Sequence, residues 1–179
     1  VEIATRAGLG TTFRLELPLS AAIQTVLLAQ TAVQLVAFPE RMITEALAFR
    51  REDVQIVNGQ RSILLHGRYL PIFRLVDLLK LPAEEAGTAR ETMGTEMAII
   101  VCEWGGRRIG IEVFKILRRH EMLIREMPPR IASIPGIGGI STLGTDRIVI
   151  VVAPDAVFDL ARRATVFGLR VADSRVAQG

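Results

Sequence analysis

The chain has 179 residues, half of them hydrophobic, with 22 basic and 19 acidic side chains and a formal net charge of +3. Acidic and basic residues are interspersed and only 5% of residues are aromatic, which argues against a nucleic-acid-binding face. No apolar run approaches the roughly 20 residues that span a bilayer. The single cysteine, Cys102, lies in an apolar stretch, where a buried, reduced thiol is expected. We therefore expect a soluble, cytoplasmic chain without nucleic acid or membrane partners.

The first predicted element is an amphipathic strand near the N-terminus. Apolar and polar residues alternate over 12–17, as in a half-buried strand. Only eleven residues precede it, too few to supply partner strands and a core. We therefore expect residues 1–19 to be the end of one domain and 20–164 to form the next.

The rest of the chain shows short strands separated by turn residues, which favours an all-β fold built from small barrels. Asn58-Gly59 and Gly105-Gly106 predict two-residue hairpin turns. Helix is expected only as one or two turns over 74–81 and as a short helix over 155–164, and the polar segment 82–96 is expected to be a loop. The expected strands cover 26–29, 33–38, 54–57, 63–65, 69–73, 97–104, 107–113 and 148–152.

Six motifs follow one another along the chain. They are GLGTTFRLELPLS at 8–20, Phe38-Pro39 with Ile43 and Glu45, LHGRYLPI at 65–72, GIEV at 110–113, EMLIR at 121–125, and Gly136-Ile137 followed by Gly139, Ser141, Gly144 and Arg147. In this order they resemble the CheW-like regulatory domain of CheA-type chemotaxis histidine kinases. The chain departs from that pattern at His66, where the family has an arginine, at Thr145-Asp146, and at Ala153.

The resemblance implies a fold and a division of the chain. The fold is all-β, with two five-stranded barrels of the src-homology-3 type packed side by side and few short helices. The first barrel would take 20–75 and 147–164, and the second would take 76–146. Residues 1–19 would end the ATP-binding domain of a histidine kinase.

The C-terminal segment has a resemblance of its own. The sequence VFGLRVADSR at 166–175 is similar to the opening strand of a receiver domain. Residues 165–179 are therefore expected to be the start of a receiver in a hybrid kinase. A single strand without its sheet cannot bury its apolar face, so we expect this tail to be loosely packed.

The resemblance also implies a scaffold without catalytic activity. Members of the family bind a CheW-type adaptor through contacts between like barrels and hold the tip of a chemoreceptor coiled coil in the groove between barrels. The kinase core of the parent chain would be the third partner. Helix-in-groove recognition needs an apolar floor and a polar rim. The candidates for the floor are Ile43, Ile72, Ile111, Ile134 and Ile137, and those for the rim are Glu45 and His66.

Each of these assignments has an alternative. The five isoleucines are ordinary core positions on the plainer interpretation. Glu45 is expected to face His66, and Arg68 is the competing partner for the same carboxylate. A free-standing CheW-type adaptor is the second interpretation of the whole chain, and the strand that precedes residue 20 argues against it.

A small β-barrel enzyme or ligand-binding protein is the third interpretation. The chain has two histidines and one cysteine, at separations that give no metal-ligand spacing. The glycines between 136 and 139 follow prolines rather than a strand, unlike a dinucleotide-binding turn. Because no acid, base and nucleophile converge, we expect no catalytic residue, no metal and no cofactor.

Overall fold

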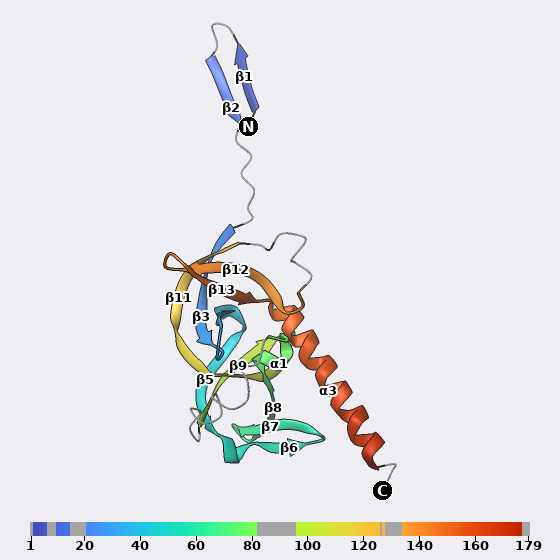
Figure 1. Ribbon diagram of the computed structural model, residues 1–179. Helices are drawn as coiled ribbons and strands as arrows, with labels where there is room; N and C mark the ends of the chain where they lie inside the picture. The colour runs from blue at the N-terminus through green and yellow to red at the C-terminus, as the bar shows by residue number, and fades with distance from the viewer. Residues whose placement is uncertain are drawn as a thin grey trace.

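A computed structural model describes residues 2–6, 10–14, 21–81, 96–125, 127 and 134–176, with side chains for 10–11, 22–81, 96–125, 127 and 134–165. These residues form an N-terminal hairpin, a closed five-stranded barrel, a six-stranded sheet and a C-terminal helix (Figure 1). The two-unit, mostly β architecture expected from the sequence is confirmed. Of the segment 82–96, expected to be a loop, residues 82–95 lie outside the described residues, and Glu96 begins a strand.

The N-terminal strand has a partner. β1 (Glu2–Arg6) and β2 (Gly10–Arg14) form an antiparallel two-stranded sheet. The expectation that the residues before 12 could not supply a partner strand was therefore wrong. A hairpin needs only five residues a side and a short connection, so the preceding residues suffice for it.

The closed barrel is made of strands from both ends of the chain, in the order β11-β12-β13-β4-β3. Its pairs are antiparallel except for β13 and β4, which run parallel. Alternate residues of these strands point inward and fill the barrel. The strands are β3 (Ala21–Gln30), β4 (Leu35–Pro39), β11 (Lys115–Arg125), β12 (Ile137–Leu143) and β13 (Arg147–Val152). The core residues are Val26, Leu28, Ala37, Met122, Ile124, Val149 and Val151.

The second unit is a six-stranded sheet rather than the expected closed five-stranded barrel. Its order is β5-β9-β10-β8-β7-β6, with β10 and β8 parallel. The strands are β5 (Ile43–Arg50), β6 (Gln55–Val57), β7 (Gln60–Leu65), β8 (Arg68–Arg74), β9 (Glu96–Trp104) and β10 (Arg107–Val113). Its own core consists of Ile63, Leu70, Ile72, Met97, Ile99 and Val101.

Three hairpins of this sheet close through two-residue turns. The turns are Asn58-Gly59, His66-Gly67 and Gly105-Gly106, and both residues of each have positive φ. Type I′ turns require this conformation at both central positions, and Asn and Gly adopt it readily. The two turns expected from the sequence are confirmed. His66, with φ of 49°, is the one of the six that is neither Asn nor Gly.

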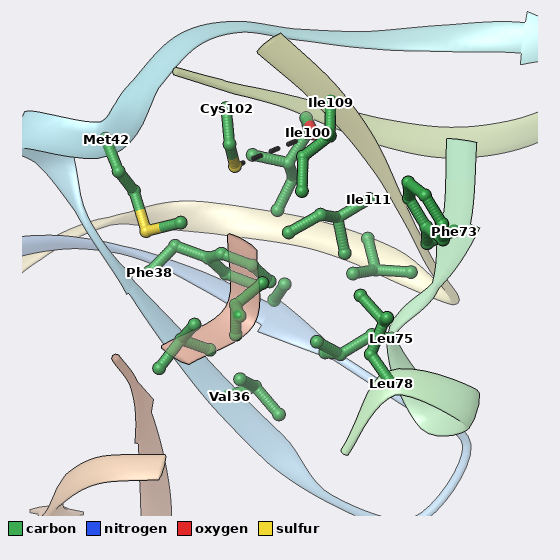
Figure 2. Close-up of a cluster of buried hydrophobic side chains, with 14 of the residues drawn as sticks. Val36, Phe38, Met42, Phe73, Leu75, Leu78, Ile100, Cys102, Ile109 and Ile111 are labelled. Atoms are coloured by element: carbon green, nitrogen blue, oxygen red, sulfur yellow. Dashed lines mark hydrogen bonds between the residues drawn. The ribbon is translucent and has the colours of Figure 1, made fainter. Parts of the chain in front are cut away.

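The barrel and the sheet share one core. The chain crosses between them through the short 3-10 helix η1 (Glu40–Met42) and again at Phe114. Figure 2 shows the shared cluster, in which Val36 and Phe38 from the barrel lie among Met42 and side chains of the sheet. Two contacts reinforce the first crossing: the Arg41 guanidinium lies 5.5 Å from the centre of the Trp104 ring, and Arg119 Nε lies 2.6 Å from Glu40 Oε1.

The crossings decide which residues belong to which unit. The barrel takes its strands from 21–39 and 115–152, whereas the sheet takes all of its strands from 43–113. The expected boundaries at 75/76 and 146/147 therefore divide the chain at the wrong places. Within 43–74, β5 pairs with β9 and β8 pairs with β10, whereas β11 and β12 pair within the barrel.

The C-terminal helix is longer than expected. α1 (Leu75–Leu78) confirms the predicted helical turn, but α3 runs from Pro154 to Val176 and includes the interval 166–175 that was expected as a strand. That strand assignment was wrong. Proline suits the first helical position, and Val157, Phe158 and Ala161 have the spacing of one helix face, which they bury in the shared core.

One carboxylate is buried in the sheet. Glu112 on β10 has a side chain that is only 5% exposed. Arg61 Nη1 lies 2.9 Å from Glu112 Oε2, and Arg51 Nη1 lies 3.5 Å from Glu112 Oε1. A buried charge without partners is strongly destabilising, because the protein interior hydrates it poorly. The two arginines therefore make the position of Glu112 tolerable.

Removal of Arg61 should cost more than neutralisation of Glu112. Arg61→Ala leaves a buried negative charge with one distant partner, and we expect a loss of about 2 kcal/mol in the free energy of unfolding. Glu112→Gln leaves two partly exposed arginines that water can hydrate, and we expect a loss of about 1 kcal/mol. Urea denaturation measures both.

The matched control is Arg74→Ala. It breaks an exposed pair with Asp77, at 3.8 Å, and should cost roughly 0 to 0.5 kcal/mol. Equal losses for Arg61→Ala and Arg74→Ala would show that Glu112 does not depend on its partner.

Candidate partner-binding surfaces

Glu45 and His66 lie together on the six-stranded sheet, as the sequence predicted. Glu45 lies on β5, just after a shift in the register of that strand against β9. His66 is at the tip of the β7–β8 turn, where its positive φ directs the chain back on itself. His66 Nε2 lies 3.0 Å from Glu45 Oε2. A carboxylate only accepts hydrogen bonds, so the imidazole Nε2–H donates.

A third residue, Arg108, completes this polar cluster of Glu45, His66 and Arg108. Arg108 Nη2 on β10 lies 3.2 Å from Glu45 Oε1, and its Nε lies 3.8 Å from Glu103 Oε2. The sequence named Arg68 as the competing partner, which was wrong. Arg108 supplies the guanidinium that the resemblance leads one to expect at position 66. Only the register of β5, β9 and β10 brings it to Glu45, so spacing along the chain gave no signal for it.

The cluster shifts the ionisation of Glu45. The hydrogen bond from His66 is the main cause that lowers the pKa of Glu45 from its ordinary value of 4.5, and the charges of His66 and Arg108 lower it further against an opposing effect of desolvation. A lowered pKa means that folding favours the carboxylate form. The contribution to stability is therefore present above about pH 4.5 and is lost as pH falls through the lowered pKa.

The five isoleucines do not gather at one surface. Ile72 and Ile111 are 1% and 0% exposed and belong to the core, so their expected role as groove floor is wrong. Ile43 is half-buried against the shared core beside the polar cluster. Ile134 is exposed, and Ile137 begins β12 in the barrel. Ile43 alone of the five lies next to Glu45.

Sequence reasoning missed an exposed row of mostly apolar side chains across the outside of the barrel. We call Ile23, Leu123, Thr142 and Ile148 the barrel row. Ile23 on β3 is the register partner of Leu123 on β11, and Thr142 on β12 is that of Ile148 on β13.

The hydroxyl of Ser141, beside Thr142, donates to the carbonyl oxygen of Leu123 at 2.8 Å and so joins the two pairs. Ile23, Leu123 and Ile148 are 73%, 46% and 60% exposed.

Charged residues of β11 border the barrel row, as the alternation of that strand shows. Glu121 and Arg125 flank Leu123 on the same outward face and are exposed, whereas Met122 and Ile124 point into the barrel. Exposed apolar side chains in contact with one another and rimmed by charges are typical of protein-binding surfaces. The alternation in β11 could have indicated the outward Leu123, but only the register joins it to Ile23.

A metal site, a membrane-spanning helix and a reactive thiol are all absent from the described residues. Among them no three His, Cys, Asp or Glu side chains gather as metal ligands would, and none of their helices has the length and hydropathy to cross a bilayer. Cys102 is fully buried, and burial raises the pKa of its thiol. A protonated thiol is a poor nucleophile and a poor metal ligand.

The ionisation of Glu45 can be tested by titration. Carbon NMR of the Glu45 carboxyl group should give a pKa below 4.5 in the wild type. His66→Asn keeps a residue that tolerates positive φ but is too short to reach Glu45, and it should raise this pKa more than Arg108→Gln does. An unchanged Glu45 pKa in His66→Asn would mean that the hydrogen bond is not formed in solution.

Comparisons with known proteins agree with this geometry. Residues 25–162 match the family described as CheW-like domain. The chain is 28% identical over 163 residues to the chemotaxis protein CheA of Salmonella typhimurium, which covers 90% of this chain and 23% of that protein. It is 24% identical over 166 residues to the sensor histidine kinase CheAY of Helicobacter pylori, which covers 93% of this chain and 20% of that protein.

A solved structure supports the fold. The scaffolding protein TtCheW from Thermoanaerobacter tengcongensis superposes with a TM-score of 0.55 at 17% identity, over 74% of this chain and 90% of that chain. The chain spans about a quarter or less of the length of the curated relatives named above. The family match, in contrast, covers most of the chain. The chain therefore belongs to the CheW-like domain family and is a distant relative of CheA chemotaxis kinases.

Proposed function

We propose that this chain is a protein-interaction scaffold that couples chemoreceptors and a CheW-type adaptor to a CheA-type histidine kinase in cytoplasmic two-component signalling. The family supports a role in chemotaxis scaffolding. The observation that carries the proposal is the barrel row, because a chain that acts by binding needs an apolar surface outside its own core. In this proposal the chain does not catalyse phosphotransfer, which takes place elsewhere in the parent kinase.

The barrel row is the docking face for the adaptor in this proposal. Its four side chains, three of them apolar, come from four strands of a closed barrel, which holds them in fixed positions relative to one another. A rigid surface loses little conformational entropy when it binds. An apolar helix face needs a groove, and nothing among the described residues shows a groove at the barrel row, so this surface suits the face of another barrel better than it suits a helix.

The polar cluster is the receptor-facing element. Glu45 holds His66 and Arg108 in place, and Ile43 provides apolar surface next to it. The fixed guanidinium and imidazole groups would bind polar groups on a receptor helix whose apolar side chains pack beside Ile43. The receptor and the adaptor thus use different strands in this proposal, so both can be bound at once.

A free-standing adaptor is the second candidate. The superposition on TtCheW covers 90% of that chain, which favours it. The hairpin of β1 and β2 and the matches to two kinases favour the kinase parent. We give preference to the kinase parent because the two matched relatives, a chemotaxis protein CheA and a sensor histidine kinase CheAY, each cover 90% or more of this chain.

The adaptor face can be tested at Ile148, the 60% exposed isoleucine that the barrel row takes from β13. Ile148→Ser removes apolar surface worth about 1.5 kcal/mol or more if it is buried on binding, so affinity for a CheW-type adaptor should fall by about tenfold in calorimetric titration. Ile56→Ser, at an equally exposed isoleucine on β6 of the other sheet, is the matched control and should leave affinity unchanged. Equal affinities for the wild type and Ile148→Ser would refute the barrel row as the docking face.

Receptor binding should respond to a variant of the polar cluster and not to a variant of the barrel row. Glu45→Gln removes the charge that holds His66 and Arg108, and we expect affinity for a soluble receptor tip to fall by about threefold or more, with adaptor affinity unchanged. Ile148→Ser should leave receptor affinity unchanged. If either variant weakens both partners to the same extent, the two surfaces are not separate.

A further inference from the structure

A hollow lies between α3 and the six-stranded sheet, and it shares only Arg108 with the surfaces described above. Its volume is about 380 Å³, within the range of sites that bind small ligands or side chains. Phe73 on β8, Ile109 on β10 and Phe158 on α3 form its apolar floor. Arg107 and Arg108 border it on the sheet side, and Arg162 borders it on the helix side.

The three arginines differ in how their charges are neutralised. Arg108 pairs with Glu45 and Glu103, and Arg162 Nη2 lies 3.4 Å from Asp159 Oδ1. Arg107 has no ion pair with any described residue. Arg107 is therefore the rim arginine whose guanidinium has no carboxylate partner among the described residues, and it lies beside an apolar hollow. That combination is complementary to a ligand that has one large apolar group next to one carboxylate.

We propose that this hollow binds a segment of a partner protein in which a large apolar side chain is followed by an acidic residue, with the apolar side chain on Phe73, Ile109 and Phe158 and the carboxylate on Arg107. The hollow is open to the surface, so a peptide can reach it. Arginine suits this role because its planar guanidinium offers two parallel donors to a carboxylate. The inference goes beyond the proposed scaffold function, since neither the barrel row nor Glu45 takes part.

The experiment uses the full chain and two capped tripeptides that differ in one group. The first is acetyl-Phe-Asp-Gly-amide, and the second replaces Asp by Asn. Methyl and ring NMR signals of Ile109 and Phe158 should shift and saturate at millimolar concentrations of the first peptide. The second should bind about fivefold or more weakly, because it lacks the charge that Arg107 recognises.

Two variants assign the effect to Arg107. Arg107→Gln should reduce the affinity of the Asp peptide to that of the Asn peptide, and should leave Glu45-dependent receptor binding unchanged. Arg162→Gln, on the opposite rim, should keep the preference for Asp. Thr165→Trp, which fills the hollow from α3, should weaken both peptides. Absence of saturable shifts at the hollow, equal binding of the two peptides, or equal effects of Arg107→Gln and Arg162→Gln would each overturn the proposal.

Discussion

The shared core between the barrel and the six-stranded sheet is the constraint on which the rest of the structure depends. Leu27, Ala29, Val36 and Phe38 of the barrel bury themselves against strands of the sheet and against α3. Neither unit could bury these side chains alone. Because burial of apolar area is the dominant stabilising term in folding, the two units hold each other, and their outward faces are left available for partners.

The available faces have different chemistry. The barrel row is apolar and lies on a surface fixed by four paired strands, whereas the polar cluster is held by hydrogen bonds and ion pairs at a turn and a strand. Apolar surface contributes chiefly to affinity, and charged groups contribute chiefly to specificity and to the rate of association. In the proposed function, this difference would let the chain distinguish an adaptor from a receptor.

Arg108 shows how the fold preserves an interaction when one residue changes. The family motif leads one to expect an arginine at position 66, where this chain has histidine. The structure brings Arg108 from a different strand to the same carboxylate, so Glu45 has a guanidinium partner despite the change. The partner groups thus include both an imidazole and a guanidinium, which differs from an arginine alone in shape and in hydrogen-bonding capacity.

The sequence by itself determined the features that depend on neighbours along the chain. Eight strand positions, the Asn58-Gly59 and Gly105-Gly106 turns and the helical turn at α1 followed from apolar runs, alternation and turn chemistry. The pairing of Glu45 with His66, which are 21 residues apart, followed from the family resemblance alone. Only the tertiary structure decided that β5, β11 and β12 are strands and that 166–175 is helical. It also decided that Ile72 and Ile111 are buried, that Arg108 pairs with Glu45, and that the side chains of the barrel row lie next to one another. The physical reason is that strand register and burial arise from contacts between residues far apart in the chain, such as Ile23 with Leu123, and no local pattern encodes such contacts.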